Sequence, residues 1–486
     1  MSSSSSPTLT LDRLTVSFPE REGAALRDVS EAIESGEFVA ITGPSGCGKS
    51  TLCRTLCGFI GSLIPAELSG RALVDGVSVF DLDPARVASR LGLVQQDPDA
   101  QVCTLRVRSE VAFGPENLCL PATEVRYLVD EALAVVGLSD LAERTTTTLS
   151  GGEKQRLAIA SILAMQPSAI LLDEPTANLD PMAAQQVFEL LGTLHREENR
   201  TLIVVEHRLA PLVAYRPRLL VMDQGRIVER RSSRERHDLL ALGLRTGKID
   251  AAHPGVPPST RDRIVIRDIS FAYTSEPVID RLSMHIHPGE IVGVIGPNGG
   301  GKSTLLRLIA GLEAPGSGDV VRTPDTRIGM VFQHPHQQIF ERTVRRELDI
   351  EEALSSEQRS FVLRDARLGG LDDVAPLSLS LGEQRRLTVA CALRTNPSVL
   401  LLDEPFIGQD RRNVAWMVGR LFAHRKQGGS VILVSHDIPL VGSLCDRLVY
   451  LNRDTVIEGD PEAVFRQLRE RGLAAFTPSF WDEGDA

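Results

Sequence analysis

Short, continuous apolar runs are the most regular feature of this sequence. The segment 37–42 contains an apolar run, and 169–172 and 202–205 are apolar at every position, so both faces of the last two expected strands are buried. Such runs are typical of parallel strands that lie between covering layers of helices. Between the first two runs, residues 121–143 carry apolar positions at helical spacing, up to a glycine at 137. The pattern predicts an α/β fold with a mostly parallel sheet.

Five elements occur twice along the chain, in the same order. The first set is the glycine loop 43–50, Gln96, Leu-Ser-Gly-Gly-Glu at 149–153, Asp173-Glu174 and His207. The second set is the glycine loop 296–303, Gln333, Leu-Ser-Leu-Gly-Glu at 379–383, Asp403-Glu404 and His436. The offset between the copies changes only from 253 at the loop to 229 at the histidine. We interpret this register as the result of a domain duplication.

The duplication predicts the domain organisation. We expect a disordered serine-rich start at 1–7, a first domain at 8–235, a linker at 236–262, a second domain at 263–470 and a tail at 471–486. Only 37 residues separate the glycine loop from the glutamine in the second copy, against 53 in the first. The missing part corresponds to 74–88, for which we expect a turn and hairpin extension. In the tail, residues 476–481, which begin with Phe476, are expected to be loosely packed, with docking on a partner as the alternative.

Composition and charge narrow the function. The 486 residues are 42% hydrophobic, which suits globular cores, and the net charge of −11 argues against a nucleic-acid partner. The seven cysteines lack the spacing of zinc sites, so reduced thiols are expected; Cys53 and Cys57 share a helical face that suits core packing. No apolar stretch approaches the ~18 residues that span a bilayer. At a membrane, another subunit must therefore form the passage.

The glycine loops predict two ATP sites in domains of the P-loop NTPase class. A Gly-x-x-x-x-Gly-Lys-Ser loop between a buried strand and a helix lets backbone N–H groups surround phosphate oxygens. Lys49 and Lys302 would reach the β- and γ-phosphates, while Ser50 and Ser303 would ligate Mg²⁺. The expected ATP-binding residues of the loops are Gly43, Pro44, Ser45, Gly46, Cys47, Gly48, Lys49, Ser50, Thr51, Gly296, Pro297, Asn298, Gly299, Gly300, Gly301, Lys302, Ser303 and Thr304.

The carboxylates and histidines at the strand ends predict hydrolysis. Asp173 and Asp403 end apolar runs where a carboxylate can hold Mg²⁺, and the adjacent Glu174 and Glu404 are placed to act as general base. The alternative for the glutamates is a surface acid at a helix start. His207 and His436 also follow apolar strands closely, and are expected to reach the γ-phosphate rather than to serve only as structural residues.

The serine and glycines at 150–152 begin a helix, which makes a second anion site. Because the glycine loop of the same domain already holds the phosphates, this second site needs a nucleotide from elsewhere. We therefore expect an intramolecular pseudo-dimer, in which each domain completes the other's ATP site. The residues expected at these second sites are Ser150, Gly151, Gly152, Ser380, Leu381 and Gly382.

The ordered set of motifs resembles the ATP-binding cassette (ABC) ATPases over nearly the whole chain. The resemblance implies two RecA-like cores, each with an N-terminal antiparallel β part and a helical signature subdomain. It also implies that Phe18 and Tyr273 stack on adenine, and that Gln96 and Gln333 contact Mg²⁺ and sense the γ-phosphate. The cofactors implied are ATP and Mg²⁺.

A narrower resemblance comes from the segments 96–101 and 333–338, both of the form Gln-x-Pro-x-x-Gln. They resemble the energy-coupling factor (ECF) and cobalt-type importers, which take up vitamins and transition-metal ions. This implies a transmembrane coupling subunit, a substrate-binding membrane subunit and a place in the cytoplasm on the inner face of the membrane. The alternatives are a soluble tandem ABC ATPase that acts on ribosomes or nucleic acid, another class of tandem importer ATPase, and loops that the prolines and glutamines merely shape.

We call the segments 149–153 and 379–383 the signatures. They differ at one position of the glycine pair, where Leu381 replaces Gly151. If the backbone there needs positive φ, leucine is disfavoured; if only the N–H matters, leucine is tolerated. Phe18 and Tyr273 differ by a hydroxyl, but either ring can stack on adenine. We expect both sites to bind ATP and the site that contains Glu404 to hydrolyse it faster.

Overall fold

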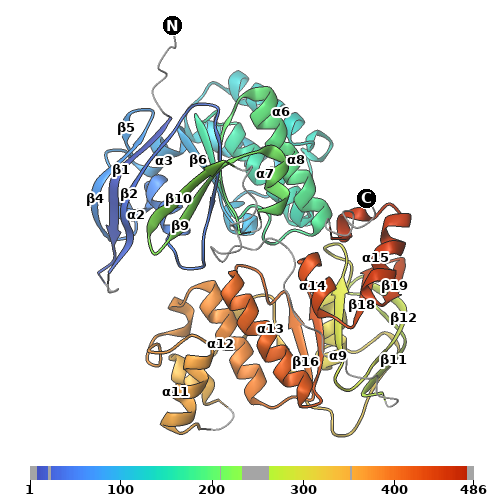
Figure 1. Cartoon of the computed structure of the whole chain (residues 1–486). Coiled ribbons are helices and arrows are strands. Elements are labelled where there is room, and N and C mark those ends of the chain that lie inside the picture. Colours follow the sequence, from blue (N-terminus) through green and yellow to red (C-terminus); the bar gives the residue numbers. More distant parts are fainter. Residues whose placement is uncertain (1–7, 20–22, 208, 233–261, 351–352, 479–486) are drawn as a thin grey trace. The chain divides into compact units, whose positions relative to one another are not determined.

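The computed structural model describes residues 8–19, 23–207, 209–232, 262–350 and 353–478 (Figure 1). The chain forms two compact units, one of residues 1–179 and 183–246, the other of 180–182 and 247–486. The described residues of each unit form one antiparallel sheet, one mostly parallel sheet and a set of helices.

An antiparallel sheet opens the first unit. Its strand order is β2-β1-β4-β5, and β1 pairs with both β2 and β4. The strands are β1 (Leu9–Ser17), β2 (Ala24–Ile33), β4 (Glu67–Val74) and β5 (Val77–Ser78). Inward residues of this sheet join α1 and one face of the central sheet in a common core.

The central sheet of the first unit has the order β10-β9-β3-β8-β7-β6, parallel except for the β9–β10 hairpin. Its strands are β3 (Phe38–Thr42), β6 (Leu91–Val94), β7 (Ala169–Asp173), β8 (Thr201–Val205), β9 (Arg218–Asp223) and β10 (Arg226–Ser232). Successive side chains alternate between two cores: Leu202 and Val204 face one, and Ile203 and Val205 the other. The apolar runs are therefore buried on both faces, as predicted. The second covering layer, however, contains the antiparallel sheet as well as α1.

The helices of the first unit fall into two groups. Those that follow the glycine loop and the antiparallel sheet are α1 (Lys49–Leu56), α2 (Phe59–Ser62) and α3 (Pro84–Ala88). The others are α4 (Pro98–Gln101), α5 (Val107–Asn117), α6 (Ala122–Val135), α7 (Gly151–Leu163) and α8 (Pro181–Glu198). Short 3₁₀ helices lie at Ser139–Leu141, Thr146–Thr148 and Ala210–Tyr215. The helix predicted within 121–143 is α6.

The second unit repeats the topology of the first. Its antiparallel sheet has the order β12-β11-β14 and its central sheet β15-β16-β17-β13-β18-β19, parallel except for the β18–β19 hairpin. The strands are β11 (Ile264–Phe271), β12 (Ile279–Ile286), β13 (Ile291–Ile295), β14 (Ser317–Arg322), β15 (Ile328–Val331), β16 (Val399–Asp403), β17 (Ser430–Val434), β18 (Arg447–Asn452) and β19 (Thr455–Gly459).

The helices of the second unit follow the same plan with fewer residues. They are α9 (Lys302–Ala310), α10 (Val344–Leu348), α11 (Ser356–Asp365), α12 (Leu381–Arg394), α13 (Arg411–Lys426), α14 (Ile438–Leu444) and α15 (Pro461–Glu470). Short 3₁₀ helices lie at Pro335–Gln338, Pro376–Ser378 and Ala474–Phe476. The described segment between β14 and β15 has no counterpart of β5 or α3, so the extension expected at 74–88 is a short hairpin followed by a one-turn helix.

The expectation of a loose tail is wrong for Phe476. Its side chain is fully buried and packs edge-on against Tyr450, with ring centroids 5.4 Å apart. The same core contains residues of α15, so the chain beyond this helix turns back onto the second unit. The serine-rich start at 1–7 and nearly all of the expected linker at 236–262 lie outside the described residues.

Candidate functional site

The first glycine loop, residues 43–48, joins the end of β3 to the start of α1. Gly43 and Gly48 have positive φ, and a Cβ on Gly43 would lie 2.1 Å from the carbonyl oxygen of Met222. Only glycine fits there, so these positions set the course of the loop. The buried Lys49 Nζ donates hydrogen bonds to the carbonyls of Gly43 (2.9 Å) and Pro44 (3.0 Å). The ammonium group therefore lies over the loop that is expected to hold phosphate.

The second glycine loop has the same construction between β13 and α9. A Cβ on Gly296 would lie 2.1 Å from the Leu451 carbonyl oxygen. Lys302 Nζ donates to the carbonyls of Gly296 (2.9 Å) and Pro297 (2.7 Å), and burial lowers its pKa. Both units thus place one buried ammonium group over a glycine-built loop at a helix N-terminus, which is an anion-binding arrangement.

Cys47 distinguishes the two loops, because the matching residue of the second loop is Gly300. The thiol is buried, and its Sγ lies 3.7 Å from Lys49 Nζ. Burial raises the pKa of Cys47 despite the nearby ammonium group. Cys47 is therefore a neutral packing residue of the loop, as are Cys53 and Cys57 in the adjacent core.

Each unit also offers a partial metal site beside its loop. Asp173, at the end of β7, and Asp403, at the end of β16, lie beside Ser50 and Ser303, the serines that follow the loop lysines, and each serine acts to lower the pKa of its neighbouring carboxyl group. Burial raises the pKa of Asp173 to about 6 and also raises that of Asp403. In each carboxylate, Oδ1 is buried without a hydrogen-bond partner in the described structure. A hydroxyl next to an unsatisfied carboxylate oxygen fits the oxygen ligands that Mg²⁺ prefers.

The next residue of each unit, Glu174 or Glu404, has a strained backbone. Their φ angles are 48° and 49°, in the left-handed region that non-glycine residues rarely adopt. Each backbone N–H donates to the end of the neighbouring strand, at Val205 (2.9 Å) and Val434 (3.0 Å) respectively. Such strain costs on the order of 1 kcal/mol and clusters at functional sites. The sequence had no signal for this feature, which recurs in both units.

In the first unit, Glu174 is held by two side chains. Its Oε1 lies 3.0 Å from His207 Nε2, and its Oε2 accepts a hydrogen bond of 3.0 Å from Gln96 Nε2. These residues follow β7, β8 and β6, whose carboxyl ends meet at one edge of the sheet. The structure therefore brings together the glutamate, histidine and glutamine of the first unit.

The second unit arranges the same residues differently. His436 Nε2 lies 2.9 Å from Asn298 Oδ1 and 3.3 Å from Glu404 Oε1. Glu404 Oε1 has no hydrogen-bond partner within the described residues, and burial raises the pKa of this carboxyl group. Glu404 is thus held less tightly by side chains than Glu174.

The signature segments begin helices in both units. Ser150 and Ser380 form capping boxes with Glu153 and Glu383 at the start of α7 and α12. Leu381 lies in the first turn of α12 with an ordinary helical backbone, as Gly151 does in α7, and neither has positive φ. The alternative that this position requires positive φ is therefore wrong, and leucine fits the backbone. Within the described first unit, no hydrogen bond joins Ser150 to the glycine loop.

The two aromatic residues expected at adenine lie near the loops. Tyr273 is 53% exposed, packs edge-on against Phe271 at 4.8 Å, and its hydroxyl lies 3.5 Å from that of Thr304 at the start of α9. Phe18 packs, partly buried, against the core that contains α1. Tyr273 therefore presents a ring beside its loop.

The Gln-x-Pro-x-x-Gln loops are closed by their last glutamine. Gln101 accepts from the backbone N–H of Gln95 (2.9 Å) and donates to the Leu93 carbonyl (3.3 Å). Gln338 makes the same pair of bonds in the second unit, at 2.7 Å each. The second glutamine of the motif thus shapes the loop in both units.

In each unit, a buried glutamate binds the backbone just after the Gln-x-Pro-x-x-Gln loop. This feature was not predicted from the sequence. Glu110 accepts from the backbone N–H groups of Cys103 and Thr104, and Glu347 accepts in the same way from Phe340 and Glu341. Both glutamates are 4% exposed. Their spacing of fourteen residues from the first glutamine is the same in the two copies, and this is the signal that could have revealed them.

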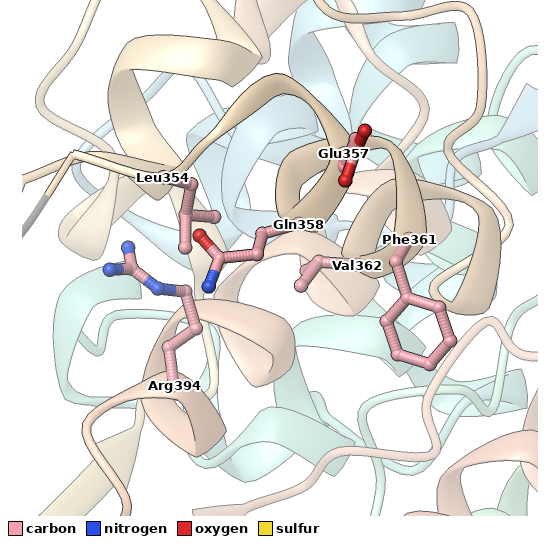
Figure 2. A pocket seen from close by; sticks show the side chains of 6 residues that line it. All are labelled: Leu354, Glu357, Gln358, Phe361, Val362 and Arg394. Atoms are coloured by element: carbon pink, nitrogen blue, oxygen red, sulfur yellow. The ribbon is translucent and has the colours of Figure 1, made fainter.

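A separate hollow of about 540 Å³ lies beside α11 in the second unit (Figure 2). It is lined by Leu354, Glu357, Gln358, Phe361, Val362 and Arg394. None of these is a predicted nucleotide-binding residue, so this hollow is distinct from the ATP site.

Together, the glycine loops, strand-end carboxylates and capped signature helices define a P-loop ATPase with two nucleotide-binding units. Comparison with known proteins shows the family. The ABC transporter family matches residues 26–177 and 279–407, and the chain belongs to this family. It is an ATPase with tandem ABC domains, and members of this family bind ATP with Mg²⁺.

Two curated relatives match both cassettes. "Putative ABC transporter ATP-binding protein" of Methanosarcina acetivorans is 32% identical, covering 98% of this chain and 90% of the relative. "Putative HMP/thiamine import ATP-binding protein YkoD" of Bacillus subtilis is 33% identical, covering 96% and 93%.

Among solved structures, ribosome-bound archaeal Pelota and ABCE1 includes a chain that matches with a TM-score of 0.70 at 21% identity, covering 94% of this chain and 80% of that one. At this identity the likeness shows the tandem fold alone. Among the described helices, none combines the length and the hydrophobicity that a bilayer-spanning segment needs.

Proposed function

We propose that this chain is the ATP-hydrolysing subunit of an ECF-type ABC importer. It drives the uptake of a vitamin or transition-metal ion through a separate transmembrane coupling subunit, which acts together with a substrate-binding membrane subunit. The chain would work in the cytoplasm, bound to the inner face of the cell membrane.

The observation that carries this proposal is the pair of Gln-x-Pro-x-x-Gln segments at 96–101 and 333–338, which we call the glutamine loops. In both units the loop is closed by a glutamine and extended by a buried glutamate, so its tip is held firmly. Apolar side chains are exposed in the segment that follows each loop along the chain: Leu105 (74%) and Phe113 (47%) in the first unit, Phe340 (78%) and Ile350 (53%) in the second. A fixed loop with exposed apolar neighbours suits docking to a protein helix. The Bacillus subtilis relative, whose name refers to HMP/thiamine import, supports the import assignment.

In the proposed reaction, each unit supplies the groups for one hydrolysis. Lys49 and Lys302 bind the β- and γ-phosphates, and Glu174 and Glu404 accept a proton from the attacking water. Ser50, Asp173 and Gln96, and likewise Ser303, Asp403 and Gln333, would hold Mg²⁺, which neutralises phosphate charge. His207 and His436 orient the γ-phosphate. The Asp173 and Asp403 oxygens without partners support this assignment.

We further propose that the two units close on each other around two ATP molecules. The signature residues Ser150, Gly151, Gly152, Ser380, Leu381 and Gly382 would then contact the nucleotide held by the other unit. The capped helix starts at these residues support an anion-binding role. Cysteine crosslinking between one glycine loop and the opposite signature tests this arrangement. Failure to crosslink with ATP bound and hydrolysis blocked would refute it.

The importer role is tested by affinity purification from detergent-solubilised membranes, followed by mass spectrometry. We expect a membrane protein to copurify with the wild-type chain and to be lost with Phe340→Asp. Val456→Asp is the matched control, because Val456 is also an exposed apolar residue (42%). It lies in the β18–β19 hairpin, at the edge of the central sheet opposite to β15, the strand that leads to the glutamine loop. Copurification of ribosomal RNA in place of a membrane protein would refute the importer role and support a ribosome-associated ATPase.

A further inference from the structure

Arg385 is a buried charge on the signature helix of the second unit. It lies in α12 and is 2% exposed. Its Nη2 donates a 2.7 Å hydrogen bond to the carbonyl of Gln333, and its Nη1 donates a 2.6 Å bond to the carbonyl of Ile407. Burial lowers the pKa of Arg385 to about 10, so the guanidinium stays protonated at neutral pH.

The two acceptors belong to the loops that carry the expected catalytic groups. Gln333 opens the glutamine loop after β15, and Ile407 follows the strained turn at Glu404 after β16. One guanidinium therefore joins the signature helix to both loops. Because the group is buried, these carbonyls would lose their donors if the side chain were shortened, and water could not readily replace it.

Among the described residues of the first unit, no guanidinium makes this connection. Gln155 occupies the matching position of α7; it is 1% exposed, and its Nε2 has no hydrogen-bond partner in the described structure. There the glutamine loop is joined to the signature helix by Lys154 and Asp99, whose charged atoms are 2.5 Å apart. Asp99 is 66% exposed, so solvent and salt weaken this pair. The two units thus use different residues, one buried and one exposed, for the same connection.

We propose that Arg385 is a positioning residue that fixes the glutamine loop and the Glu404 turn of the second unit for ATP hydrolysis. The inference rests on the roles proposed above for Gln333 and Glu404, and not on import. Since the glycine loop makes most of the contacts expected with ATP, Arg385 acts on the rate of the chemical step more than on binding. This role also accounts for the arginine of α12 at the position where α7 has Gln155.

The test uses steady-state ATP hydrolysis and amide hydrogen exchange on the purified full-length chain. For Arg385→Gln, which installs the residue of the first unit, we expect total kcat about threefold lower and KM for MgATP within about twofold of wild type. Amide exchange should become faster at 333–338 and 404–409 and stay unchanged at 96–101. Arg385→Lys, whose single ammonium group can hold one carbonyl at a time, should give an intermediate kcat.

Arg386→Gln is the matched control for loss of a buried guanidinium from the same helix. Arg386 is 6% exposed and donates to the carbonyls of Ala366 and Gly382, which lie outside both loops. This variant should lower the melting temperature but leave exchange at 333–338 unchanged.

An unchanged kcat in Arg385→Gln would overturn the proposal, as would faster exchange spread over the whole chain in Arg385→Gln and Arg386→Gln alike. If Arg385→Gln does not fold, Arg385→Lys decides, and wild-type kcat and exchange in that variant would overturn the proposal. Because no membrane protein is present in these assays, failure of the importer role does not affect the result.

Discussion

The unequal holding of the two glutamates predicts unequal hydrolysis. Glu174 has a side-chain donor at each oxygen, Gln96 at 3.0 Å and His207 at 3.0 Å. Among the described residues, Glu404 has the His436 ring at 3.3 Å near one oxygen, while the other oxygen accepts the backbone N–H of His436 at 3.2 Å. A glutamate that must give up a hydrogen bond before it accepts a proton from water is the weaker base. We therefore expect the Glu404 site to be faster.

The size of this difference follows from the contact of His207 with Glu174 Oε1 at 3.0 Å, because the matching oxygen of Glu404 has no hydrogen-bond partner among the described residues. A hydrogen bond to a charged group contributes about 1 kcal/mol or somewhat more, and 1 kcal/mol corresponds to a rate ratio of roughly five. If the sites turn over independently, the Glu404 site carries about five sixths of the total rate. Glu404→Gln should then leave about one sixth of wild-type activity, and Glu174→Gln about five sixths.

Phosphate release under saturating MgATP measures these activities, with nucleotide binding measured in parallel to confirm two ATP molecules per chain in each variant. Equal and near-complete loss in both variants would show that the sites act only together and that the independent-site estimate is wrong. A larger loss in Glu174→Gln than in Glu404→Gln would refute the reasoning from hydrogen bonding.

Three further predictions concern packing and conformation. Phe476→Ala should lower the free energy of unfolding by about 3 to 5 kcal/mol, because a fully buried ring is removed; denaturant unfolding measures this, and a loss below 1 kcal/mol would show that the chain end is loosely packed. Leu381→Gly should leave kcat unchanged and lower stability by about 1 kcal/mol, because the backbone there is helical; a clear rise in kcat would show that leucine impairs the site. The exposed Cys103 and Cys119 should react with a thiol reagent in the native protein. Burial raises the pKa of Cys57 to about 12, so this residue should stay a neutral thiol at pH 8 to 9 and react only after unfolding. Peptide mapping of the labelled protein distinguishes these outcomes, and labelling of native Cys57 would contradict its burial.

The sequence by itself determined the architecture and named the residues of the candidate site. Apolar runs at 169–172 and 202–205 indicated buried parallel strands because consecutive apolar side chains alternate between the two faces of a strand. The glycines at 43 and 296 indicated tight loops because their backbone approaches a neighbouring carbonyl too closely for any Cβ. Such signals are local in the chain, and their repetition in register made them specific.

Other features were decided only by the tertiary structure. The burial of Phe476 depends on Tyr450, which lies on a different element of the second unit, and no pattern near position 476 shows it. The same holds for Arg385, whose acceptors at Gln333 and Ile407 come from two other segments, and for the difference in how Glu174 and Glu404 are held. These are contacts between residues distant in sequence. A motif names the groups of a site, but the distances that set their basicity and position arise only when the strands and helices pack together.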